Sequence, residues 1–270
     1  MMGMMGDKLF INGQKSRVEN IGTSAYRIRI LNGSNARIYN LAWGDGERLQ
    51  IIGTDGGLIE RPIFRNSLLL APGERVDLIR DFSNANMGSA VSLVSQPLIV
   101  GRGETFSLVS FQINEKKSKN FRLPEKLCSI RPLSMADAVN ADGPKRFSFR
   151  MEQGKGWTID GMTYEMRKST PKETIALGSL EVWELENSSS GMMAMPHPVH
   201  IHGSQFQVIE RSAARFENYL DAGWKDTILI MPGERVRLLK RFDLYKGYFV
   251  YHCHNLEHED MGMMREFHVV

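Results

Sequence analysis

Hydrophobic and polar residues alternate in many short segments of the chain, which is the pattern of strands with one buried face. Clear examples are YRIRILN (26–32), AVSLVS (90–95), FSFRM (147–151) and YFVYHCH (248–254). They are rich in Val, Ile, Phe and Tyr and are bounded by Gly, Asn or Pro, as strands usually are. No long segment has the period of an amphipathic helix. The pattern predicts an all-β chain built from β-sandwiches or barrels.

One motif occurs twice in the chain. APGERVDLIRDF (71–82) and MPGERVRLLKRF (231–242) share PGERV, end on Phe and lie 160 positions apart. In each copy Pro-Gly marks a turn, and strand-like alternation follows it. A match of this kind indicates two copies of one fold.

The repeat divides the chain into two predicted domains, residues 1–114 and 146–270. A polar, proline-containing segment over residues 115–145 lacks sustained alternation and is interpreted as a surface connection. The first domain leads from Met-Gly residues directly into the strand-like DKLFINGQ. We therefore expect it to lack its first strands, which would leave an open edge and an uncovered core.

Composition excludes several classes of protein. The 270 residues are 42% hydrophobic and 24% charged, as is usual for globular proteins. The net charge of +3 is spread along the chain, which argues against nucleic acid as the main partner. No window approaches the roughly 18 consecutive apolar residues of a membrane-spanning helix, and MMGMMGDK does not have the form of a signal peptide. Two cysteines cannot form a disulfide framework, and Cys128 is interpreted as a buried free thiol or as a residue that pairs outside this chain.

Six of the seven histidines lie in two short segments of the second predicted domain, MPHPVHIHG (195–203) and YHCHNLEHEDMGMM (251–264). Imidazole, thiol and thioether groups gathered this closely indicate a metal site rather than packing. A structural zinc site is the alternative, but zinc favours sets with two or more cysteines, and only Cys253 is present here.

Alternate side chains of a strand share a face, so the two segments predict two kinds of site. On the Cys253 side, His197 and His258 can join the thiolate, with Met263 as a weak fourth contact. This is the blue-copper arrangement, which supports one-electron transfer. The opposite side carries two His-x-His pairs, formed by His200, His202, His252 and His254.

These segments resemble the two C-terminal copper motifs of the multicopper oxidases, a family that includes laccases and bacterial cuprous oxidases. LNGSNARIYNL (31–41), WTIDGMTYEM (157–166) and AGWKDT (222–227) are similar to further segments of the bacterial enzymes. The resemblance implies cupredoxin-like Greek-key β-sandwiches, of which this chain matches the second and third. The first copy, which contains no histidine, resembles the family's copper-free middle domain.

The resemblance also implies roles by position. Type 1 copper would bind His197, Cys253, His258 and, axially, Met263; type 2 copper would bind His200; and the type 3 pair would bind His202, His252 and His254. Glu259 matches an acid that the family uses on the oxygen side, so it is the expected proton donor. Met195 is at a position that resembles a cuprous-substrate contact of bacterial members. Asp260 is a second, minor candidate for contacting the substrate.

Methionine usage bears on the reductant. Methionines gather at residues 1–5, 192–195 and 261–264. Their soft thioethers favour Cu(I), whereas methionine also serves as a flexible core residue. Cu(I) and phenolic reductants therefore both stand as predicted substrates.

The family's trinuclear copper cluster takes four His-x-His pairs, and this chain has two. The resemblance thus implies an N-terminal cupredoxin domain as a partner, either a separate chain or a missing segment, with O₂ reduced to water by the completed enzyme. This chain alone is expected to be inactive. A blue-copper electron carrier is the alternative function, although it would have no use for the paired histidines, and a copper-free structural relative is the third class. Export to the periplasm is implied only by analogy with bacterial relatives.

Overall fold

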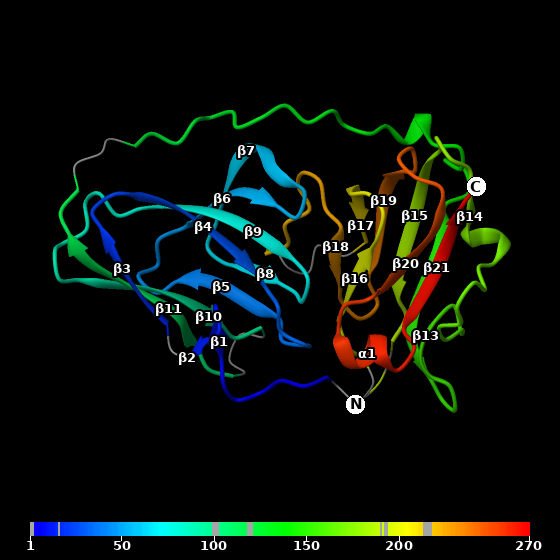
Figure 1. Ribbon diagram of the computed structural model, residues 1–270, viewed down its shortest axis with the longest axis horizontal. Coiled ribbons are helices and arrows are strands. Elements are labelled where there is room, and N and C mark those ends of the chain that lie inside the picture. The colour runs from blue at the N-terminus through cyan, green and yellow to red at the C-terminus, as the bar shows by residue number, and fades with distance from the viewer. Residues whose placement is uncertain are drawn as a thin grey trace.

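The computed structural model is almost entirely β-structure, which confirms the predicted fold class. It describes residues 3–15, 17–98, 103–117, 121–189, 191, 194–212 and 218–270. Two β-sandwiches lie side by side, and the segment that joins them runs along one edge of both (Figure 1). The helical elements of the described residues are α1 (Leu256–Asp260) and the 3-10 turns Met135–Asp137 and Pro171–Glu173.

The first sandwich consists of two facing sheets and a small ribbon. One sheet runs in the order β3 (Arg17–Gly22), β11 (Phe106–Glu115), β10 (Ala90–Gln96), β5 (Tyr39–Trp43), β8 (Leu68–Leu70). The other runs in the order β4 (Ala25–Leu31), β9 (Arg75–Asp81), β6 (Leu49–Thr54), β7 (Gly57–Arg65). The ribbon pairs β1 (Phe10–Ile11) with β2 (Gln14–Lys15).

The second sandwich repeats this arrangement. One sheet runs in the order β14 (Thr174–Ile175), β21 (Met264–Val269), β20 (Gly247–Cys253), β16 (His197–Ile201), β18 (Thr227–Ile230). The other runs in the order β13 (Gly156–Ile159), β12 (Lys145–Glu152), β15 (Leu180–Asn187), β19 (Arg235–Arg241), β17 (Phe206–Arg211). β14 is parallel to β21, as β3 is to β11.

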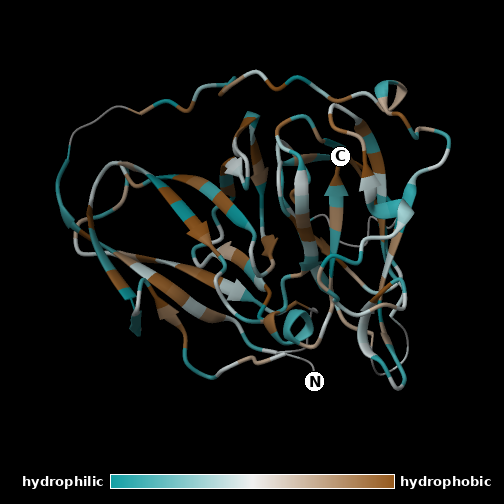
Figure 2. Cartoon of the chain, turned by 45° about the vertical axis from the view of Figure 1, so that its right-hand side comes forward, coloured by the Kyte–Doolittle hydropathy of each residue, from teal (hydrophilic) through white to brown (hydrophobic). Residues whose placement is uncertain are grey.

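Each sandwich has its own apolar core between its sheets. In the first, Trp43, Phe82 and Phe111 pack against one another. In the second, Trp183 packs against Tyr251 and other buried aromatic rings. Hydrophobic and hydrophilic positions alternate along several strands (Figure 2), as expected for strands with one buried face.

Among the described residues, no strand pairs with β4 on the side away from β9, which agrees with the open edge expected from the sequence. In the second sandwich β15 pairs with β12 on one side and with β19 on the other. The equivalent strand of the first sandwich, β4, pairs with β9 alone among the described residues. A cavity of about 980 Å³ lies at this side and reaches core residues such as Leu41 and Phe111.

The joining segment contacts both sandwiches. The amide of Leu127 donates to the carbonyl of Glu60 at 2.9 Å, and the amide of Val139 donates to the carbonyl of Leu180 at 2.9 Å. Cys128 in this segment is a free, half-buried thiol. The boundaries at residues 114 and 146 stay a prediction, and β12 already begins at Lys145.

Candidate metal centre

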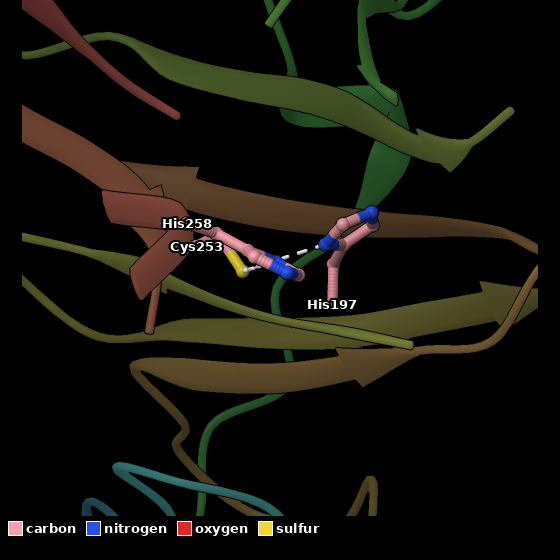
Figure 3. Close-up of side chains that lie close together, drawn as sticks. All are labelled: His197, Cys253 and His258. Atoms are coloured by element: carbon pink, nitrogen blue, oxygen red, sulfur yellow. Dashed lines mark hydrogen bonds between the residues drawn. The ribbon is translucent and has the colours of Figure 1, made fainter. Parts of the chain in front are cut away.

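Two strands and one helix bring together a buried group of three metal-binding side chains. His197 begins β16, Cys253 ends β20, and His258 lies on α1 just after that strand. The Sγ atom of Cys253 is 3.4 Å from Nδ1 of His197 and 3.6 Å from Nδ1 of His258. All three residues are fully buried. Figure 3 shows a nitrogen of each imidazole directed toward the sulfur.

Hydrogen bonds between residues close in sequence after β20 bring His258 back over the end of the strand. The amide of His258 donates to the carbonyl of Asn255 at 3.0 Å, and the amide of Met263 donates to the carbonyl of His258 at 2.9 Å. The amide of Cys253 donates to the carbonyl of Met263 at 3.0 Å, so this fully buried methionine lies next to the cysteine. Trp157 on β13 stacks on His258 with ring centres 3.8 Å apart.

The three buried donors fit copper. Burial raises the pKa of the Cys253 thiol, and burial together with His258 lowers the pKa of His197 well below its usual value. Without a cation the group therefore holds a neutral thiol and a neutral imidazole, whereas a bound metal ion would stabilise the thiolate. One thiolate, two imidazoles and the thioether of Met263 in the same core form the soft donor set that copper prefers.

The opposite face of the same two strands carries a second group of imidazoles. His200, His202 and His252 each place one nitrogen within 4.8 Å of the others. Nε2 of His202 lies 3.3 Å from Nε2 of His252. The ring centre of His254 is 5.7 Å from that of His252 and 5.9 Å from that of His200. Strand alternation thus separates Cys253 from its two histidine neighbours, as the sequence indicates.

The surroundings favour the neutral form of two imidazoles in this second group. Partial burial and the neighbouring His200 and His252 lower the pKa of His202 to about 4, and burial lowers the pKa of His254. Oε2 of Glu259 lies 3.1 Å from Nδ1 of His252, and the hydrogen bond between them lowers the pKa of Glu259. Neutral imidazoles beside a carboxylate are the form in which these groups bind a cation.

His200 is oriented by two residues that sequence reasoning missed. Its Nδ1 is 2.9 Å from the hydroxyl of Thr227 and 3.5 Å from Oδ1 of Asp226. Burial alone would raise the pKa of Asp226, but hydrogen bonds with Arg75 and His200 lower it. The AGWKDT segment (222–227) contains both residues and resembles a segment of the family, but the sequence alone assigns it no role.

The remaining predicted residues lie around the two groups. Met195 is buried in the same core as Cys253, and Asp260 is exposed at the end of α1. His268 lies on β21 and belongs to neither group. Four methionines considered as Cu(I) contacts lie outside the described residues: Met1, Met2, Met192 and Met193.

The fold and the donors define a β-sandwich protein with a buried thiol–imidazole site and an imidazole cluster on the opposite face. A multicopper oxidase family model matches residues 138–270. The laccases of Bacillus stratosphericus and Bacillus subtilis (strain 168) are 31% and 30% identical to this chain, over 98% and 96% of its length. The chain belongs to the multicopper oxidase family.

Solved structures agree with this assignment. The McoA multicopper oxidase from the hyperthermophile Aquifex aeolicus matches with a TM-score of 0.87 and 32% identity, covering 99% of this chain and 60% of that one. A multicopper oxidase from Campylobacter jejuni, described as a metallo-oxidase, matches with a TM-score of 0.80 and 29% identity, covering 99% of this chain and 58% of that one. The two Bacillus laccases are covered over 55% and 54% of their length, so the chain spans about half the length of the curated relatives it matches. Among the described residues, no helix has the length and apolar character needed to cross a membrane.

Proposed function

We propose that this chain supplies the type 1 copper site and half of the oxygen-reducing copper cluster of a laccase-like multicopper oxidase. The observation that carries the proposal is the separation of donors on one pair of strands. The thiol and two imidazoles meet on the buried face, and on the other face His200, His202 and His252 gather with the ring of His254 beside them. A protein that carried electrons through a single copper would need only the first face.

The proposed ligands follow from this separation and from the family. Those of type 1 copper are His197, Cys253, His258 and, axially, Met263; that of type 2 copper is His200; those of the type 3 pair are His202, His252 and His254. Bound copper would supply one-electron oxidation of a reductant and the reduction of O₂ to water.

The chain itself would contribute a short connection and a dry environment. Cys253 lies between His252 and His254, so a few covalent bonds join the two faces. The ring of Trp157 covers His258, and the fully buried position of the first group excludes water from it. A water-free site with fixed ligands would keep the same donor geometry when the charge of a bound metal ion changes.

Glu259 is the proposed proton donor on the oxygen side. Its hydrogen bond with His252 favours the ionised carboxylate, so Glu259 first takes up a proton at an Oε atom and then passes it inward. The partly exposed position of this carboxylate suits exchange with water.

The other half of the cluster would come from an N-terminal cupredoxin domain of the same enzyme, present as a separate chain or as part of a longer protein. The proposed reductant is Cu(I) or a phenol, with Met195 and Asp260 as the proposed contacts. The multicopper oxidase from Campylobacter jejuni is described as a metallo-oxidase, and similarity to it favours a metal ion over a phenol as the reductant. Export to the periplasm is proposed by analogy with bacterial relatives.

Copper loading tests the proposal. The copper-loaded chain should show an intense thiolate-to-copper absorption band in visible light and a second, non-blue class of Cu(II) in its electron paramagnetic resonance spectrum. It should not sustain O₂ consumption with Cu(I) or a phenol. A missing visible band would contradict the type 1 assignment, and one blue copper per chain with no second class would favour the electron carrier. Sustained O₂ reduction by this chain alone would contradict the need for a further domain.

A further inference from the structure

A turn of the first sandwich lies against the second group of imidazoles, although that sandwich contains no histidine. Gly73, in the turn over residues 71–75, has a φ of +82°. A Cβ atom at this position would lie 2.5 Å from Cδ2 and 2.9 Å from Nε2 of His254. Any side chain here would collide with the imidazole, so the bare backbone of Gly73 forms the surface on which His254 rests.

Two residues later, Arg75 is linked to His200, another histidine of the group, through Asp226. Its guanidinium binds both oxygens of Asp226, at 2.5 Å to Oδ1 and 2.6 Å to Oδ2. Oδ1 of Asp226 accepts from the hydroxyl of Thr227 at 3.0 Å, and that hydroxyl contacts Nδ1 of His200 at 2.9 Å. Because Nδ1 of His200 is engaged here, Nε2 is left as its metal-binding nitrogen.

A buried carboxylate fixes the turn relative to this strand. Asp55, whose side chain is fully buried, accepts from the amide of Arg75 at 2.8 Å. It also accepts from the amides of Asp226 and Thr227, each at 3.2 Å. One carboxylate therefore holds the end of the turn and the start of β18 in register across the two sandwiches.

The repeat provides an internal comparison, because the turn over residues 231–235 has the same local structure. The amide of Gly73 donates to the carbonyl of Asn32 at 2.9 Å, and the amide of Gly233 donates to the carbonyl of Asn187 at 2.8 Å. Gly233 has a φ of +76°, yet a Cβ atom there would meet none of the described residues within 4 Å. Arg235 is exposed. The turn therefore forms without contacts of the kind that Gly73 and Arg75 make.

We propose that the 71–75 turn is a positioning element of the second metal site, with Gly73 seating His254 and Arg75 holding His200 through Asp226. This inference rests on the proposed function, since it requires the imidazole group to bind metal. It assigns the copper-free sandwich a direct part in the geometry of the cluster.

The test compares Gly73→Ala and Arg75→Ala with the matched controls Gly233→Ala and Arg235→Ala in the full chain. Cu(II) is titrated into each protein. The visible band reports the Cys253 face, and the non-blue paramagnetic resonance signal reports the imidazole face. Loss of an orienting partner typically costs 10- to 100-fold in metal affinity, so we expect about that loss at the imidazole face for the first two variants. Their visible band and both controls should be unchanged, and Arg75→Lys should not restore binding because lysine cannot bind a carboxylate through two parallel hydrogen bonds.

A second readout needs no metal. In the metal-free chain, Gly73→Ala should shift the imidazole ¹⁵N resonances of His254, and Arg75→Ala should shift those of His200, whereas the controls should shift neither. Unchanged affinity and unchanged resonances in the first two variants would overturn the inference. Equal loss of both copper signals in those variants would overturn it too, because it would mean that the turn only supports folding. If the parent chain binds no copper on the imidazole face, the proposed function fails, and the resonances alone decide the positioning role.

Discussion

The two sandwiches share one hydrogen-bonded framework. The side-chain amide of Asn32 donates to the carbonyl of Leu70 at 2.9 Å, and that of Asn187 donates to the carbonyl of Ile230 at 3.1 Å. Both asparagines are buried, and each also accepts from an amide two residues later. The framework therefore forms equally in a sandwich with metal-binding residues and in one without them.

The difference between the sandwiches lies in the side chains that occupy equivalent positions. In the first, Leu41 pairs with Leu68 and Ser95, and in the second, Val199 pairs with Ile228 and Cys253. The same registers match Tyr39 with His197, Ala42 with His200, Val94 with His252 and Ser95 with Cys253. Metal donors are thus additions to a framework that does not require them, so their removal and the loss of the framework are separable experiments.

The largest expected effect comes from Cys253→Ser, which puts into the second sandwich the residue that the first has at the equivalent position. Without the thiolate no sulfur-to-copper charge transfer is possible, so the visible band should disappear entirely. Absorption spectra of the copper-loaded variant provide the measurement. Cys128→Ser, on the joining segment, should keep the band. A band that survives in Cys253→Ser would show that another group is the chromophore.

The shared framework is tested by Asn32→Ala and Asn187→Ala. Each change leaves buried backbone groups without a partner, which should lower the free energy of unfolding by about 2 to 4 kcal/mol. Only Asn187 also binds the carbonyl of Met195, at 2.6 Å, close to where β16 brings in His197. We therefore expect similar destabilisation in urea but a weaker visible band in Asn187→Ala alone. Equal loss of the band in both variants would contradict the separation of framework and site.

A smaller, pH-dependent difference concerns Lys240, which corresponds to Arg80 in the first sandwich. Arg80 binds Oδ2 of Asp45 at 2.6 Å, whereas Lys240 is fully buried and donates to the carbonyl and hydroxyl oxygens of Ser204. Burial lowers the pKa of Lys240 to about 7, from 10.5 for the ordinary side chain. Between these values the unfolded chain binds the extra proton, so stability should rise with pH.

Relative to Lys240→Met, the free energy of unfolding of the parent chain should therefore increase by about 2 kcal/mol between about pH 7 and about pH 9. Urea unfolding at several pH values measures this difference. Arg80→Met is the matched control and should show no such trend, because arginine stays protonated over this range. A flat difference for Lys240→Met would mean that the lysine is hydrated or paired in the folded chain.

The local sequence pattern was sufficient to predict the fold class and the strand face on which each metal donor lies. Alternation in YFVYHCH (248–254) places Cys253 opposite His252, and the PGERV repeat indicates two copies of one fold. Both are short-range features, because a strand and a turn depend mainly on neighbouring residues.

The orienting residues could not be predicted in this way. Arg75 and Asp226 are far apart in the chain, and they meet only because the two sandwiches pack against each other in one fixed arrangement. The stacking of Trp157 on His258 likewise depends on how β13 lies over α1. Such contacts leave no periodic pattern in the sequence. The repeated PGER motif and the AGWKDT segment do contain the residues that make the first of them.

The most direct test of the account is a crystal structure of the copper-loaded chain with anomalous diffraction data collected at the copper absorption edge. We expect one copper peak among His197, Cys253 and His258, and separate copper density among His200, His202 and His252. Copper at the Cys253 face alone would reduce the protein to an electron carrier. No peak at that face would contradict the central claim that two distinct metal sites lie on opposite faces of one strand pair.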